Sequence, residues 1–154
     1  LASTNLVKIP KFNMLPPWEH PEEYADWIRQ TLLNSPSNGI VDRCFIDELA
    51  YGPVMRGKVS LSILDLVSIC TVYGNVKPLL IITDPGADSI VSTYKQREQY
   101  PNLPENLMVR EEYYKTIHKR PFSEAPLYIF NYNFDPDYTL VKSVIKHYLK
   151  EEVK

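Results

Sequence analysis

The feature that most constrains this chain is its alternation of short apolar runs with longer segments of helical period. Runs of strand length, rich in β-branched residues, lie at residues 5–12, 40–41, 77–86 and 126–133. Between and after these runs, apolar residues recur at the spacing of one helix face. This strand–helix order predicts an α/β fold with a mostly parallel sheet and helices on both faces.

The helical segments carry recognisable boundary residues. Pro21 is expected at the start of a helix that extends to residue 34, and Asp135 is expected to cap the last helix, with Pro136 just inside. A short helix after residue 45 should stop at Gly52–Pro53, and Gly74 should end the helix that begins near Ser62. The inward side chains of that helix are expected to be Ile63, Leu64, Leu66, Val67 and Cys70.

Length and charge exclude several classes of function. The 154 residues predict one domain spanning residues 1–154, and the net charge of −2 argues against nucleic acid bound through a broad basic face. The longest apolar run is too short to cross a membrane, and no signal peptide is visible. The two cysteines, Cys44 and Cys70, suggest neither a disulfide framework nor a metal site, so we expect both to be buried and reduced in a cytoplasmic protein.

Residues 39–57, "GIVDRCFIDELAYGPVMRG", hold the strongest candidates for chemistry. Asp42 and Arg43 follow a strand, and ligands of open parallel sheets bind beyond the carboxyl ends of the strands. Arg43 could hold two phosphate oxygens, and Asp42 could hold a magnesium-bound water or orient the arginine. Glu48 and Arg56 come next and could reach the same crevice. The alternative for Asp42–Arg43 is an ordinary surface ion pair.

The string "VDRCFIDELAYGPVMRG" resembles a segment of the thymidylate-kinase-like deoxynucleoside monophosphate kinases, particularly those of phages and viruses. Downstream, "LLIITDP" resembles the next central strand of that family. "YKQREQYP" resembles its arginine-bearing lid, here over about residues 92–112, and "REEYYKTI" the helix that follows. "APLYIFNYNFD" resembles the last strand and the loop near the adenine. The resemblance covers residues 5 to 150 and implies a nucleoside-monophosphate-kinase-like fold.

The resemblance also implies an activity: phosphoryl transfer from ATP with Mg²⁺ to a (deoxy)nucleoside monophosphate. Arg43 would bind the acceptor phosphate, and Asp42 would assist at the magnesium ion or the transferred phosphoryl group. Glu48 would contact the nucleoside or its sugar. The other implied contacts are Arg56 to the base or phosphate, Tyr51 stacking or excluding a 2′-hydroxyl, Lys95 and Arg97 as lid cations, and Phe12 and Trp18 lining the acceptor pocket. Core packing is the alternative for Phe12 and Trp18. Family members are often dimers, so the resemblance makes a homodimer possible, but the sequence does not settle the oligomeric state.

One part of the family pattern does not occur in this sequence. Family members begin with a strand, a GxxxxGK[ST] phosphate-binding loop and a helix, whereas the five glycines here never have that spacing. The run "LVKIPKF" corresponds to the second strand of the family, so a unit of about 25 residues would normally precede it. Either the N-terminal unit is missing from this sequence, which its start at Leu1 favours, or the fold has lost its donor site.

Three functions follow from these alternatives. The first is a nucleoside monophosphate kinase. The second is a non-catalytic module, derived from the kinase fold, that binds a nucleotide or a protein. The third is a deoxynucleoside kinase, whose acceptor has no phosphate, so that replacing Arg43 would have little effect on acceptor binding.

Overall fold

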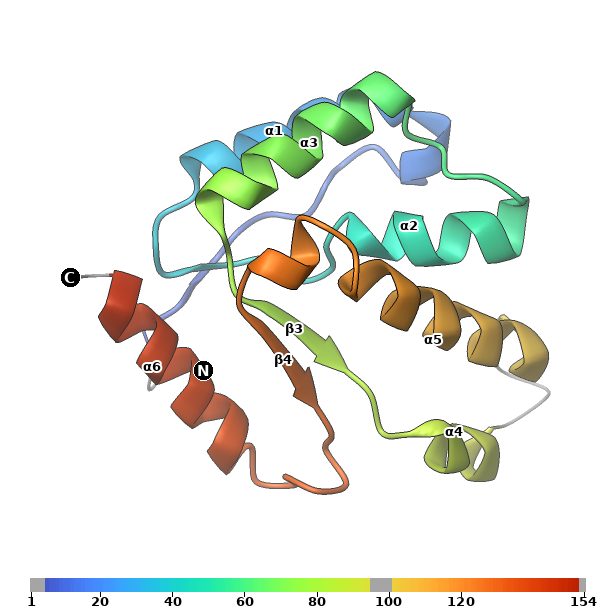
Figure 1. Cartoon of the computed structure of the whole chain (residues 1–154), viewed down its shortest axis with the longest axis vertical. Helices are drawn as coiled ribbons and strands as arrows, with labels where there is room; N and C mark the ends of the chain where they lie inside the picture. Colours follow the sequence, from blue (N-terminus) through green and yellow to red (C-terminus); the bar gives the residue numbers. More distant parts are fainter. Residues whose placement is uncertain (1–4, 95–100, 153–154) are drawn as a thin grey trace.

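The computed structural model describes residues 5–94 and 101–152 (Figure 1). The described strands are β1 Val7–Lys8, β2 Gly39–Ile40, β3 Leu80–Thr83 and β4 Leu127–Phe130. The α-helices are α1 Pro21–Asn34, α2 Ile46–Tyr51, α3 Ile63–Val76, α4 Ala87–Thr93, α5 Leu103–Ile117 and α6 Thr139–Glu152. Shorter helical segments are η2 Pro17–Glu19, η3 Gly52–Arg56 and η4 Phe122–Glu124. The predicted α/β class is confirmed.

The strands pair in parallel, as predicted, but in two separate pairs. β1 pairs with β2, with Val7 opposite Gly39, and β3 pairs with β4, with Leu80 opposite Leu127. Within the described part of the chain, these are two two-stranded sheets and not one continuous sheet. The fold therefore differs from the predicted single sheet by a break between the β1–β2 pair and the β3–β4 pair.

The β3–β4 pair has helices on both faces. Leu80, Ile82 and Ile129 turn one face towards the main core, which contains residues of α1, α2, α3 and α5. The other face, with Phe130, packs with Val141 and other residues of α6. Figure 1 shows α6 on one side of β4, and α1 beside α3 on the other side of the molecule.

Helix α2 ends at Tyr51 with Gly52 as its C-cap, so the predicted stop at Gly52–Pro53 is confirmed, but a further helical segment follows that was not predicted. After α2 the chain continues as the π-helical segment η3 and ends at Gly57, whose φ of 73° is left-handed. Pro53 is tolerated because it lies in the first turn of η3, where a missing N–H is least costly. The η3 segment brings Arg56 beside Glu48 of α2, with which it forms an ion pair.

Helix α3 begins as predicted but exposes a different face. Ser62 caps it by accepting a hydrogen bond from the backbone N–H of Asp65, at 3.1 Å. The helix ends at Val76, with Lys77 as its C-cap, rather than at Gly74. The predicted inward residues include three exposed ones: Ile63 at 80%, Leu64 at 83% and Val67 at 60%. The buried residues are instead Ile69 and Tyr73. This helix is apolar on most of its circumference, so its sequence could not indicate which face α1 would cover.

The end of the chain and the cysteines differ slightly from expectation. Helix α6 begins at Thr139, yet the Asp135 carboxylate still caps it by accepting from the N–H groups of Leu140 and Val141, each at 3.1 Å. Both cysteines are free, as predicted, but half-buried rather than buried. None of the described helices has the length and apolar character needed to span a bilayer.

Candidate functional site

A cavity of about 650 Å³ lies between the two strand pairs. Residues 39–47, which include β2, and residues 78–85, which include β3, both line it, and α1 and α5 complete its walls. Trp27, Ile28 and Leu32 of α1 make part of it apolar. The charged lining residues belong to the ends of the strands, to α2 and to α5: Asp42, Arg43, Asp47, Asp84 and Arg110. The cavity is thus apolar along the strands and charged where the strands end.

The strand edges that face this cavity are open. On β3, the N–H groups of Leu80 and Asp84 donate to carbonyls beside β4, at 3.0 and 2.8 Å. Because successive residues of a strand direct their N–H groups to opposite edges, Ile81 and Thr83 must face away from β4. On β2, the carbonyl of Ile40 accepts a hydrogen bond from the β1 side, so Val41 faces away from β1. Both open edges belong to residues that line the cavity.

Arg43 lies at the cavity with an unusual backbone. Its φ of 70° is left-handed, which is costly for a residue with a side chain. The side chain is 75% exposed, and its ion-pair contact, with Asp47, is long at 3.9 Å. Strain of this kind is most common at functional sites, where the surrounding fold imposes it. The predicted phosphate-binding residue therefore lies at the edge of a cavity with most of its donors open to solvent.

Asp42 lines the same cavity and pairs with Lys11 at 3.3 Å. Both of these side chains are more than half exposed. No group of three potential metal ligands occurs among residues 5–94 and 101–152. Magnesium in phosphoryl-transfer sites is often held by one or two carboxylates together with substrate phosphates. Asp42 fits the role of one such ligand, but the described residues do not form a magnesium site of their own.

Asp47 forms an acidic wall of the cavity together with two tyrosines. It accepts a hydrogen bond from the hydroxyl of Tyr113, and Tyr51 packs edge-on against the Tyr113 ring with centroids 6.3 Å apart. Burial raises the pKa of Asp47, and the hydrogen bond from Tyr113 and the charge of Arg43 only partly oppose this effect. Burial and the neighbouring Asp47 likewise raise the pKa of Tyr113. Tyr51 and Arg43 therefore line the same cavity, with Asp47 in contact with Arg43 at 3.9 Å.

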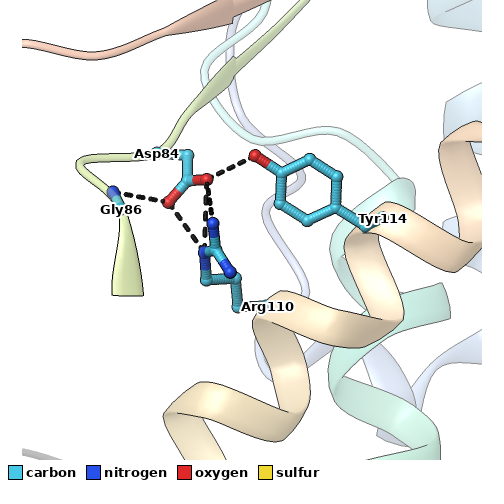
Figure 2. A network of polar contacts seen from close by, with 4 residues as sticks. All are labelled: Asp84, Gly86, Arg110 and Tyr114. Carbon is cyan, nitrogen blue, oxygen red and sulfur yellow. Dashed lines mark hydrogen bonds and ion pairs between the residues drawn. The ribbon is translucent and has the colours of Figure 1, made fainter. Parts of the chain in front are cut away.

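A second polar group lies where β3 ends (Figure 2). Asp84 is buried, and its carboxylate accepts hydrogen bonds from Arg110, from the hydroxyl of Tyr114 and from the N–H of Gly86. Burial acts to raise the pKa of Asp84, but these hydrogen bonds outweigh it and hold the pKa below its usual range. The apolar run at residues 77–86 includes Asp84, but the sequence did not predict this residue as part of the site, nor did it indicate its partners. The sequence signal that could have indicated them is the spacing of Arg110 and Tyr114, which lie four residues apart on one face of α5.

Glu48 and Arg56 form a pair apart from this cavity. Glu48 is buried, accepts from the Arg56 guanidinium and also accepts from the N–H of Ser60 at 3.0 Å. The Arg56 guanidinium lies over the ring of Trp18, 4.5 Å from its centroid. Neither Glu48, Arg56 nor Trp18 lines the cavity around Arg43. Their expected contacts with an acceptor remain predictions.

Two further groups of predicted residues have different outcomes. Phe12 is buried and packs against Tyr24 and Trp27, with ring centroids 5.1 and 5.9 Å away, so it occupies the core position that was its alternative. Lys95 and Arg97, the expected lid cations, lie outside the described residues. The structure therefore joins Asp42, Arg43 and Tyr51 at one cavity and adds Asp47, Asp84 and Arg110 to them.

Fold and site together define an α/β protein with a charged cavity at the ends of parallel strands. Comparisons of the chain with protein-family models, with characterised proteins and with solved structures found no match.

Proposed function

We propose that this chain binds the acceptor of an ATP-dependent (deoxy)nucleoside monophosphate kinase of the thymidylate-kinase-like type. The observation that supports this most is Arg43, which the end of β2 holds in a strained conformation at a cavity. A guanidinium with free donors matches the oxygens of a phosphate group in pairs. Since the ion pair of Arg43 within residues 5–94 and 101–152 is a long one, with Asp47 at 3.9 Å, binding a phosphate breaks no strong ion pair there.

The remaining cavity walls suit the rest of a nucleotide. Tyr51 lines the same cavity as Arg43 and offers a ring and a hydroxyl to the nucleoside. Asp42 lies next to Arg43 and can hold a cation that accompanies the phosphates. These contacts describe acceptor binding and orientation, which supply much of the catalysis in phosphoryl transfer.

The described residues do not fit the phosphates of ATP, since the whole sequence contains no GxxxxGK[ST] loop. The cavity supports a specific source for that loop. Open edges of β2 and β3 face the cavity, and one further parallel strand could pair with both. The proposal therefore includes a strand and phosphate-binding loop supplied from outside these 154 residues, which would bring the donor phosphates beside Arg43.

Calorimetric titration of the 154-residue chain with thymidine monophosphate and with thymidine tests the acceptor site. We expect the monophosphate to bind more tightly than the nucleoside and Arg43→Ala to weaken monophosphate binding by about 2–3 kcal/mol. Arg120→Ala is the matched control, because Arg120 is 85% exposed and its ion pair among the described residues is with Glu124. Equal binding of thymidine and its monophosphate, unaffected by Arg43→Ala, would favour a deoxynucleoside kinase instead.

A second assay tests turnover. A coupled ADP-release assay on the protein with its natural upstream sequence, using each deoxynucleoside monophosphate, should detect phosphoryl transfer. The second candidate function, a non-catalytic binding module, is favoured by the lack of a donor loop in the sequence. Acceptor binding without turnover by that longer protein would support the module and contradict the kinase.

A further inference from the structure

The side chains at the end of β3 hold an arginine in one fixed orientation (Figure 2). The Asp84 carboxylate accepts from Nε of Arg110 at 3.0 and 3.2 Å and from Nη2 at 3.0 Å. The Tyr114 hydroxyl also donates to Asp84, while the Tyr114 ring lies 5.0 Å from the guanidinium carbon. One edge of the guanidinium is thus fully used, and its plane is supported by a ring.

The other edge of the same guanidinium is open. Across the two described ranges, the Arg110 Nη1 atom has no hydrogen-bond acceptor, and the side chain is 30% exposed. Arg110 lines the cavity together with Arg43. An arginine needed only to neutralise Asp84 could be held anywhere around that carboxylate. Here it is held so that two N–H donors remain directed away from Asp84.

Arg110 and Arg43 are linked through one helix. Tyr113 lies three residues after Arg110 on α5, which places the two side chains on the same side of the helix. The Tyr113 hydroxyl donates to Asp47, which is the acid beside Arg43. Two guanidinium groups therefore meet the same cavity, one from the end of β2 and one from α5 at the end of β3.

We propose that Arg110 is a second anion-binding residue of this cavity and contacts a phosphoryl group adjacent to the one at Arg43. The ligand class is a compound with two linked phosphoryl groups, such as a nucleoside diphosphate. This inference rests on the proposed function, in which a monophosphate at Arg43 becomes a diphosphate. Asp84 is the positioning residue: its carboxylate fixes the guanidinium before the ligand arrives, so little side-chain entropy is lost on binding.

The probes are inorganic pyrophosphate, thymidine diphosphate and thymidine monophosphate, titrated calorimetrically into the 154-residue chain at low salt. We expect Arg110→Gln to weaken binding of pyrophosphate and the diphosphate by about tenfold or more, as for loss of a charged hydrogen bond. Binding of the monophosphate should change by less than about threefold, because its single phosphate is held by Arg43. Arg120→Gln, at an exposed site away from the cavity, should leave all three affinities unchanged.

A further pair of variants separates binding from folding. Arg110→Gln leaves the buried Asp84 carboxylate without its cation and can therefore destabilise the fold. The double variant Asp84→Asn/Arg110→Gln removes both charges, so it should stay folded and show a cooperative unfolding transition in urea. The double variant should show the same loss of pyrophosphate binding. Tyr114→Phe keeps the ring and the cation, so its pyrophosphate affinity should stay within about threefold of the parent. This result would show that the Arg110 guanidinium, and not the Tyr114 hydroxyl, contacts the pyrophosphate.

Three outcomes would overturn this inference. They are the absence of pyrophosphate binding to the parent chain, unchanged pyrophosphate binding in a folded Arg110 variant, and an equal loss for monophosphate and diphosphate. The proposed function fails on a different result, which is unchanged monophosphate binding in Arg43→Ala. The failure of this inference can therefore be distinguished from the failure of the proposed function.

Discussion

Two aspartates at the same cavity have opposite pKa shifts, and the difference lies in their partners. Asp84 receives hydrogen bonds from a guanidinium, a hydroxyl and a backbone N–H, so its charged form is stabilised despite burial. Asp47 is half-buried with one hydroxyl donor and a distant arginine, so the loss of solvent contact outweighs these partners and raises its pKa. A carboxylate with a lowered pKa stabilises the fold above its ordinary pKa, and one with a raised pKa destabilises the fold there.

This contrast predicts opposite effects for Asp84→Asn and Asp47→Asn. At pH 7, Asp84→Asn should lower the free energy of unfolding by about 2 kcal/mol, because charged hydrogen bonds are lost. As pH falls through the lowered pKa of Asp84, the parent loses this stabilisation, so the difference should shrink below about pH 4.

Asp47→Asn should leave stability at pH 7 unchanged or higher, because the amide oxygen still accepts from Tyr113. Urea unfolding at pH 7 and pH 3.5 measures both. A constant gap for Asp84→Asn would contradict the assignment.

At the scale of elements, the run from α2 into η3 depends on the close approach of two segments at Gly52. A Cβ atom there would lie 2.7 Å from the carbonyl oxygen of Lys58 and 2.6 Å from the Glu48 carboxylate. The first of these is backbone and cannot move cheaply. The glycine thus allows η3 to fold back so that Arg56 reaches Glu48. The Gly–Pro pair, which resembles a stop signal, is part of the helical path.

Gly52→Ala and Gly74→Ala should therefore have opposite effects on stability. Gly52→Ala should destabilise the protein by about 1–3 kcal/mol, as overpacking does. Gly74 lies inside α3, where an added Cβ would meet only Pro121 at an ordinary 3.5 Å. Because alanine favours the helix over glycine, Gly74→Ala should stabilise by up to about 1 kcal/mol. Thermal and urea unfolding of both variants give the comparison. An unchanged free energy of unfolding for Gly52→Ala would contradict the close approach of Gly52 to the Lys58 carbonyl oxygen.

For the whole molecule, the main feature is the cavity that separates the β1–β2 pair from the β3–β4 pair. Parallel sheets are normally covered on both faces and continuous across their strands. Here the faces of β3–β4 are covered, by the main core and by α6, yet one edge of β3 meets the cavity. The charged residues gather at the strand ends of that cavity. The open edge of β3 and the proposed phosphate-binding residues Arg43 and Arg110 therefore line the same cavity.

Amide hydrogen exchange of the 154-residue chain tests whether this edge is open. Leu80 and Asp84 donate to backbone carbonyls beside β4 and should exchange slowly. Ile81 and Thr83, on the same strand, face the cavity and should exchange much faster. The alternation along one strand is its own control, because neighbours share the same local environment. Equal protection of all four amides would mean that the edge is already paired.

Much of the fold could be predicted from local patterns. The α/β class, the parallel pairing and helices α1 and α6 follow from periodicity and from the apolar runs, which depend on near neighbours. The face of α3 was predicted wrongly, since Ile63 and Leu64 are exposed, and the helical segment η3 that follows α2 was not predicted. Both depend on which distant segment packs there, α1 in one case and residues 58–60 in the other.

The candidate site divides in the same way. The sequence indicated Asp42, Arg43 and Tyr51 because all three belong to one local string that follows a strand. It did not indicate that Arg110 would hold Asp84, 26 residues earlier, or that Tyr113 would reach Asp47 from 66 residues away. Hydrogen bonding at such separations leaves no local pattern. Backbone periodicity thus determined the order and kind of the elements, whereas only tertiary packing decided which charged side chains share a cavity.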